Sequence, residues 1–208
     1  MKLLVKTGPL ASIALAALVA ACASSSPAPV LLTLPPVTAI PAAAAAAAVP
    51  GAPASAPLLA VRRVAIPEYL VARRVRYRAD AATLAEWSNT YWAERIEIGV
   101  SREFVSALRQ QLPGWAMCDT NCGDQVPALS LQVNLVPMDY VRGAQKLQAR
   151  ARITLSGTGA PARVLDTKEL SVEIASNADT AQGHAQAIAT LIEKVAAEAA
   201  PMIRNARP

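Results

Sequence analysis

A stretch without charge decides how much of this 208-residue chain can build a core. From Ala23 to Pro57 there is no charged residue, eight prolines interrupt the chain, and Ala42–Ala48 is an unbroken alanine run. Seven alanines between prolines are too few for an independent helix, which needs about 12–15 residues. Pro-rich chains favour extended conformations instead. The sequence therefore predicts a disordered Ala/Pro-rich excursion over 37–57, followed by one folded domain over 58–206.

A compact apolar run lies inside the uncharged stretch. Val30–Leu34 ends at Pro35-Pro36, which is typical of a short strand that stops at a breaker. We therefore predict the first strand of the fold within 30–36. The alternative is that this run is part of the linker.

The N-terminus has the composition of a secretory signal peptide. Two lysines precede an apolar stretch, Leu10–Ala21, which ends in small residues. This stretch is shorter than the roughly 20 apolar residues that a membrane-spanning helix needs. The order Val19-Ala20-Ala21-Cys22 resembles a bacterial lipobox. This resemblance implies that 1–21 is removed, that Cys22 carries acyl chains such as palmitate, and that 22–29 is a lipidated tether. The alternative is an ordinary signal peptide followed by an incidental cysteine.

The residue after Cys22 bears on the compartment. It is Ala23 rather than Asp, and by analogy with lipoprotein sorting we expect an outer-membrane protein that is lipid-anchored and faces the periplasm. Loss of the two leader lysines leaves 18 basic against 15 acidic residues, a net charge of +3. So small an excess gives little support for a polyanionic partner, and we expect no nucleic acid.

Arginines are concentrated between Arg73 and Arg78. Alternation along a strand puts Arg74, Arg76 and Arg78 on the same face. That face is either solvated, or it contacts anionic lipid headgroups or an acidic partner.

Alternation of apolar and polar side chains marks the half-buried strands of an antiparallel sheet. Runs rich in Val and Ile mark others, although they alternate less clearly. Strands are predicted at 58–66, 75–78, 129–135, 147–155 and 170–174, with a further extended piece at 83–91.

Two segments have the period of an amphipathic helix. Apolar residues four apart from Ile96 to Leu108 predict the first, and a stripe between 177 and 206 predicts a closing helix that Pro201 ends or kinks. We therefore expect an α+β fold in the order β-β-β-α-β-β-β-α, with a mostly antiparallel sheet of about five strands and two helices packed on one face.

Cys118 and Cys122 remain once Cys22 is acylated. The periplasm is oxidising, and a disulfide across three residues is possible in a turn. The alternatives are a metal site and a redox-active pair. However, two thiolates without further ligands nearby cannot fill a tetrahedral zinc shell, and the spacing is not Cys-x-x-Cys. We therefore favour a structural disulfide, and we expect no metal and no cofactor.

Groups for catalysis are sparse. The single histidine, His184, lies in the first turn of the predicted closing helix, where packing or capping is its usual role. The turn at 156–159 is rich in glycine but has no lysine after it, so it is no phosphate loop. No nucleophile is paired with a base. We expect a non-enzymatic protein.

Aromatic residues gather before the first predicted helix. Trp87, Tyr91 and Trp92 lie within six residues of a chain in which only 4% of residues are aromatic. One interpretation is core packing beneath that helix. The other is a surface for a partner chain or an acyl chain, because Trp and Tyr are favoured at both. The candidate partner or lipid contacts are Tyr69, Arg74, Arg76, Trp87, Tyr91 and Trp92.

Several short motifs occur in order along the chain. Leu32-Thr33-Leu34-Pro35 comes first, VAIPEYL follows at 64–70, and Trp92-Ala93-Glu94 then enters the predicted helix. This order resembles the ABC-type transport auxiliary lipoproteins, the PqiC-like family, whose strand end reads V-x-x-P-x-Y-L. The chain departs from the family pattern where Val71-Ala72-Arg73 replaces the usual Asp-Arg, and its first strand has no aromatic residue.

The resemblance covers about 30–205 and implies function by association. Such lipoproteins accompany MCE-type (mammalian-cell-entry-domain) machines, which move phospholipid or other hydrophobic molecules between the inner and outer membranes. It implies an adaptor on the outer-membrane side, an MCE-domain protein as partner, a possible homo-oligomer and no catalytic residues. The alternatives are a periplasmic lipid-binding carrier and a structural envelope lipoprotein without a transport role.

Overall fold

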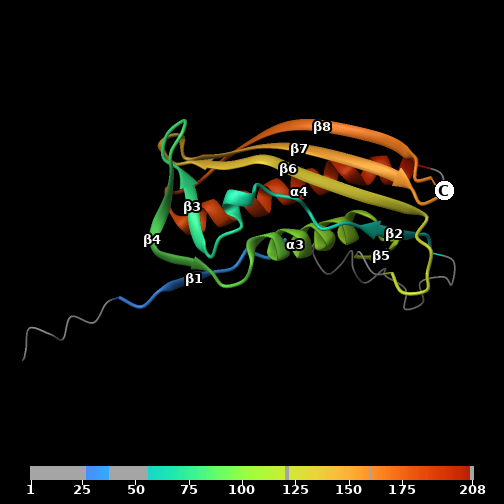
Figure 1. Cartoon of the computed structure of the whole chain (residues 1–208), viewed down its shortest axis with the longest axis horizontal. Coiled ribbons are helices and arrows are strands. Elements are labelled where there is room, and N and C mark those ends of the chain that lie inside the picture. The colour runs from blue at the N-terminus through green and yellow to red at the C-terminus, as the bar shows by residue number, and fades with distance from the viewer. Residues whose placement is uncertain (1–26, 38–55, 120–121, 160, 207–208) are drawn as a thin grey trace, which may run out of the picture.

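The computed structural model describes residues 27–37, 56–119, 122–159 and 161–206. Within these residues, one eight-stranded sheet is covered by two helices (Figure 1). The elements are β1 Val30–Leu32, β2 Leu58–Val61, the 3-10 helix η2 Glu68–Leu70, β3 Arg74–Arg78, β4 Leu84–Trp92, α3 Ile96–Gln111, β5 Ala116–Cys118, β6 Leu129–Val141, the 3-10 helix η3 Arg142–Ala144, β7 Lys146–Gly157, β8 Val164–Ala175 and α4 Ala181–Asn205.

The 13-residue strand β6 organises the sheet. One edge of β6 pairs antiparallel with β7, which pairs antiparallel with β8. The other edge pairs in parallel with β2 near its start and with β3 at its end. Beyond these, β5 pairs in parallel with β2, while β4 pairs antiparallel with β3 and in parallel with β1. The two ends of the sheet are therefore built from different short strands.

The expected α+β class with two helices is confirmed, but the details of the predicted sheet are wrong. The described residues form eight strands rather than about five, and four of the seven strand pairings are parallel rather than mostly antiparallel. The order has four strands, not three, before each helix. Two strands account for the changed order: β5 was not predicted, because three residues are too few to show a period, and β4 was expected only as an extended piece at 83–91. The parallel pairings of β1 and β2 join strands that are far apart in the chain, which a local period does not show.

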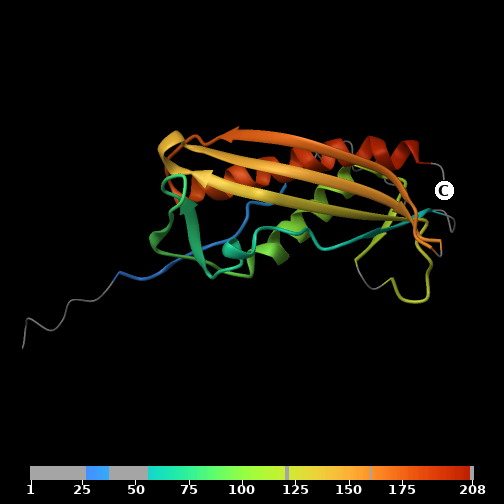
Figure 2. The same cartoon turned by 45° about the horizontal axis from the view of Figure 1, so that its top comes forward.

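The core lies between the sheet and the helices. Along β7 the residues from Leu147 to Leu155 alternate, so that every second side chain is buried and Arg150 and Arg152 face solvent. Figure 2 shows the long strands on one side, with α4 behind them and α3 beside α4. Alanines supply much of the buried face of α4 and allow a close approach to the sheet. Of the two predicted effects of Pro201, an end of the helix is wrong, since α4 continues through Pro201 to Asn205.

Several predictions fall outside the described residues. They are the signal peptide 1–21, the acylated Cys22, most of the tether 22–29 and nearly all of the excursion 37–57. The strand expected within 30–36 lies within the described part and spans Val30–Leu32. No helix of the described chain has the length and apolar character needed to cross a membrane.

Candidate functional site

The six predicted contact residues lie close to one end of the sheet. Tyr69 belongs to η2, Arg74 and Arg76 to β3, and the other three belong to β4. Backbone pairing of β3 with β4 sets their mutual positions. The structure therefore brings the whole set together, although its members play different parts.

An irregularity in β4 decides which aromatic residues share a face. Tyr91 lies opposite Arg74 and Glu86 lies opposite Arg76, so Tyr91 and Glu86 share a face although five positions separate them. The intervening Asn89 has a positive φ of 51°, which marks the irregularity. Simple alternation would put Trp87 with Tyr91, whereas the observed register puts it on the opposite, core-facing side.

Both tryptophans serve packing. Trp92 is only 4% exposed and meets the His184 ring edge-on at 6.2 Å between centroids. Trp87 is partly buried between Tyr77, at 5.0 Å, and Tyr140, at 6.2 Å. The core-packing interpretation thus describes this pair.

An arginine that the sequence analysis did not select covers the Trp87 ring. The Arg142 guanidinium lies 4.4 Å from that ring centroid and donates to the Tyr77 hydroxyl at 3.0 Å. It also pairs with Asp179 at 3.0 Å, and the hydrogen bonds to Asp179 and Tyr77 raise the pKa of Arg142 above its ordinary value. This arrangement joins β4 to the start of α4.

Tyr69 is held by an ion pair. Its hydroxyl donates to Asp139 Oδ1 at 3.0 Å, and Arg78 reaches both oxygens of the same carboxylate at 3.1 and 3.0 Å. Burial, and then the hydrogen bond to Asp139, raise the pKa of Tyr69 above 10.0. Tyr69 is therefore a positioned, neutral phenol rather than a free surface group.

The outer face of β3 is a set of charge pairs within the sheet. Arg76 Nε lies 3.2 Å from Glu86 and Arg74 Nε lies 3.4 Å from it. Arg76 also donates to the Tyr69 carbonyl at 2.8 Å, which ties β3 to η2. The Arg74 side chain remains 49% exposed and lies over the Tyr91 ring at 5.2 Å. Of the two arginines, Arg74 is the one available to a partner.

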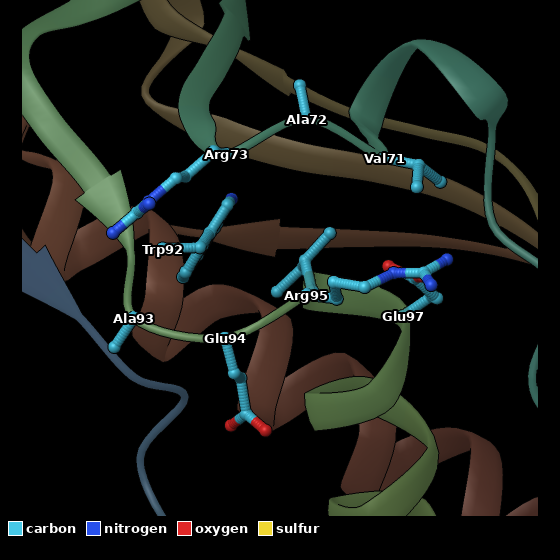
Figure 3. Close-up of a pocket in the computed structure, with 9 residues that line it drawn as sticks. Val71, Ala72, Arg73, Trp92, Ala93, Glu94, Arg95 and Glu97 are labelled. Atoms are coloured by element: carbon cyan, nitrogen blue, oxygen red, sulfur yellow. The ribbon is translucent and has the colours of Figure 1, made fainter.

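A pocket of about 330 Å³ opens beside this surface. Figure 3 shows Val71, Ala72 and Arg73 facing the segment that enters α3. Glu94 turns away from the pocket and binds Arg102 Nη1 at 2.7 and 2.8 Å. The full lining is Val71, Ala72, Arg73, Trp92, Ala93, Glu94, Arg95, Ile96 and Glu97.

The chemistry of this pocket is that of binding. Its apolar walls come from Trp92 and Ile96, and the guanidinium of Arg95 forms an ion pair with the buried carboxylate of Glu97. Arg73 is exposed at the rim. Such a lining can hold an amphiphile, but it pairs no nucleophile with a base.

His184 occupies the core rather than a site for chemistry. It is 2% exposed and stacks on Tyr140 at 4.7 Å, and burial lowers its pKa to about 3. Within the described residues, no group of three or more His, Cys, Asp or Glu side chains could hold a metal ion. Cys118 and Cys122, the last of the predicted site residues, form a disulfide with 5.2 Å between their Cα atoms.

The sequence did not point to two residues that lie in or beside the first described segment in space, Leu31 and Asn89. The Asn89 side-chain amide donates to the carbonyls of Pro27 and Ala28 at 2.8 and 2.9 Å. Leu31, next to Tyr91 in the sheet, is 56% exposed. An exposed leucine has no sequence signature, whereas an Asn in a strand is a usable signal for positive φ.

Comparisons with known proteins support one family. The ABC-type transport auxiliary lipoprotein component matches residues 38–200, which confirms the resemblance seen in the sequence. A crystal structure described as that of an uncharacterized protein has a TM-score of 0.66 at 19% identity, over 85% of this chain and 99% of its own. Protein XCC0632 from Xanthomonas campestris, of family DUF330, has a TM-score of 0.56 at 15% identity, over 85% and 92%. At these identities the two structures show the fold alone, and no curated protein matches.

The match over 38–200 extends from the uncharged stretch to the last turns of α4. It includes the whole surface built by η2, β3 and β4, together with the pocket beside it. This family is an auxiliary component of transport systems. The chain belongs to the ABC-type transport auxiliary lipoprotein component family.

Proposed function

We propose that this protein is the outer-membrane lipoprotein of an MCE-type system, which moves phospholipid or other hydrophobic molecules across the envelope. The observation that carries the proposal is the family match over 38–200. In support, the sequence has a lipobox-like segment at 19–22, five positions before the structure begins at Pro27. Acyl chains on Cys22 would anchor the domain, because each buried CH₂ contributes about 0.8 kcal/mol.

The protein acts as an adaptor in this proposal. Its partner is an MCE-domain protein that reaches the outer membrane, and self-association of the adaptor is part of the same expectation. Among the predicted contacts Arg74 is exposed, and Tyr91 is partly buried beneath it. Tyr69 is held by Asp139, Trp87 and Trp92 pack, and Arg76 is tied to Glu86 and Tyr69. We therefore expect any direct contact by the predicted set to centre on Arg74 and Tyr91.

The anchor and the partner are tested in separate steps. The full chain is expressed with its leader, and the mass of the mature protein is measured beside that of Cys22→Ser. We expect cleavage before Cys22 and an added mass of acyl chains, and neither in the variant. A wild-type protein without acyl chains contradicts the anchor.

The acylated protein is then mixed with each recombinant MCE-domain protein encoded in the same genome. We expect one of them to co-elute in size-exclusion chromatography, with light scattering reporting the number of copies. Co-elution with none contradicts the adaptor role. Lipid extracted from the purified protein alone, at one molecule per chain, would favour the carrier alternative.

A further inference from the structure

We propose that one face of the sheet lies against the lipid headgroups of the membrane in which the chain is anchored. This face is the row Leu31, Tyr91 and Arg74, here called the tether-side row. The inference rests on the proposed function, because it takes the acylation of Cys22 as given. It adds which surface of the domain meets the bilayer.

The three side chains form a continuous row across three strands. Leu31 is the registered neighbour of Tyr91 between β1 and β4, and Tyr91 lies opposite Arg74 between β4 and β3. Registered neighbours project to the same side of a sheet. The opposite side at this point is core, since Leu32 and Trp92 are buried there. The row therefore faces outward as a unit.

The composition of the row suits a membrane interface. Leu31 offers a side chain that is 56% exposed, Tyr91 is an amphipathic ring, and the Arg74 guanidinium lies over that ring at 5.2 Å. An apolar group, a tyrosine and an arginine are the residue types that settle at the level of lipid headgroups.

Charge around the row favours an anionic surface. Arg73, Arg74 and Arg76 lie within four consecutive residues, and Glu86 is the acidic group paired with the last two. Arg73 is exposed at the rim of the neighbouring pocket. Three guanidiniums against one carboxylate leave an excess of positive charge, and anionic headgroups attract such clusters.

The short segment between Cys22 and Pro27 places the tether-side row near the membrane. Asn89 holds the carbonyls of Pro27 and Ala28 beside β4, so the chain enters the domain at this edge. Five residue steps separate Cys22 from Pro27, and a fully extended chain covers at most about 18 Å over them. An acylated Cys22 therefore keeps this end of the domain near the bilayer. Figure 1 shows the loop between β5 and β6 at the other end of the molecule.

A fluorophore placed at Leu31→Cys tests the proposal in the full acylated chain. The matched control is Val126→Cys, at a residue that is 83% exposed in the loop between β5 and β6. Acylation blocks the Cys22 thiol, and the disulfide occupies Cys118 and Cys122, so the label reacts with the new cysteine alone. The vesicles contain phosphatidylethanolamine and phosphatidylglycerol, with a nitroxide quencher on the headgroups.

We expect several-fold stronger quenching at position 31 than at position 126. The quenching at position 31 is expected to weaken when phosphatidylglycerol is omitted or when Arg74→Gln is added. Arg150→Gln, at an exposed arginine on β7, is expected to leave it unchanged. Equal quenching at both positions, or quenching at neither, overturns the proposal while the anchor stands. Shielding of position 31 only after an MCE-domain protein is added also overturns it, in favour of a protein contact.

Failure of the anchor gives a different result. If Cys22 carries no acyl chains, the wild-type chain itself takes up the label and does not float with the vesicles. The proposed function then loses its anchor, and the orientation falls with it.

Discussion

His184 is a titratable group enclosed by aromatic rings. Its imidazole stacks on Tyr140 and meets Trp92 edge-on, and burial lowers its pKa from 6.5 to about 3. The folded protein therefore keeps this histidine neutral at pH values where the unfolded chain protonates it. Stability from this residue is fully present above pH 6.5 and is lost as the pH falls toward 3.

We expect the free energy of unfolding to fall by up to about 1.4 kcal/mol per pH unit below pH 6.5 because of His184 alone. Urea unfolding of the wild type and of His184→Gln, at a series of pH values, measures the difference between them. Carboxylates also titrate in this range, so the two proteins are compared at each pH. Parallel stability curves for the wild type and the variant would show that His184 does not carry the effect.

Gly183 shows a conflict between propensity and packing. It lies in the first turn of α4, where its amide donates to the Thr180 hydroxyl that caps the helix. A Cβ at this position would overlap the Ala178 carbonyl oxygen and would lie 2.5 Å from Ser176 Oγ. Helix propensity predicts a gain of up to about 1 kcal/mol for alanine in a helix interior, whereas the overlap predicts a loss.

We expect Gly183→Ala to lower the free energy of unfolding by about 1–3 kcal/mol, because the overlap with backbone atoms forces the chain to shift. Thermal unfolding measures the change. Gly114→Ala is the control, since no atom lies within 4 Å of its added Cβ, and it is expected to be nearly neutral. A stabilised Gly183→Ala protein would contradict the packing argument.

At the scale of elements, the end of β4 presents two faces with two roles. Trp92 faces the core and Tyr91 faces outward beneath Arg74. We expect Trp92→Ala to destabilise the fold by about 3–5 kcal/mol, as truncation of a buried tryptophan does. We expect Tyr91→Ala to cost much less stability, but to weaken contact of the tether-side row with vesicles. Urea titrations of both variants test the contrast, and equal losses would contradict the assignment of faces.

The sequence predicted the long elements better than the short ones. β7 alternates without interruption, so its face could be assigned from Leu147 to Leu155. In β6 the predicted strand stops at Leu135, but the strand continues to Val141 after a shift in register between Leu135 and Met138. An inserted residue moves the buried positions by one, and a search for strict alternation ends at that point.

The candidate site was only partly predictable, because a strand irregularity and a long-range pairing decide which residues share a face. Aromatic and basic residue types selected six residues that lie together at one end of the sheet. The side on which each residue lies depends on the positive φ of Asn89 and on pairing with β1, which begins about 60 residues earlier in the chain. Such non-local pairing has no counterpart in a window of neighbouring residues, so Leu31 and Asn89 were missed.

At the scale of the whole molecule, one face of the sheet is covered by the helices and the other faces solvent. The helices cover one face, and the other carries charge pairs such as Lys146 with Glu173 and Arg152 with Glu169, both at 2.8 Å. Solvent and salt screen exposed pairs of this kind, so they contribute little to stability. Stability therefore comes from the apolar layer between the sheet and the helices.

The long-range pairing of the first strand has a consequence for the order of events during export. Val30 pairs with Thr90, and Leu59 pairs with Leu129. The first strands therefore cannot pair until residues about 60 to 70 positions later in the chain are available. A chain that crosses a membrane from its N-terminus delivers β1 before the strand that will hold it, and closure of so long a loop is slow. If Cys22 is acylated as proposed, the enzymes that modify it meet the N-terminus before β1 has its partner strand. The topology therefore predicts that the proposed acylation comes before the fold is complete.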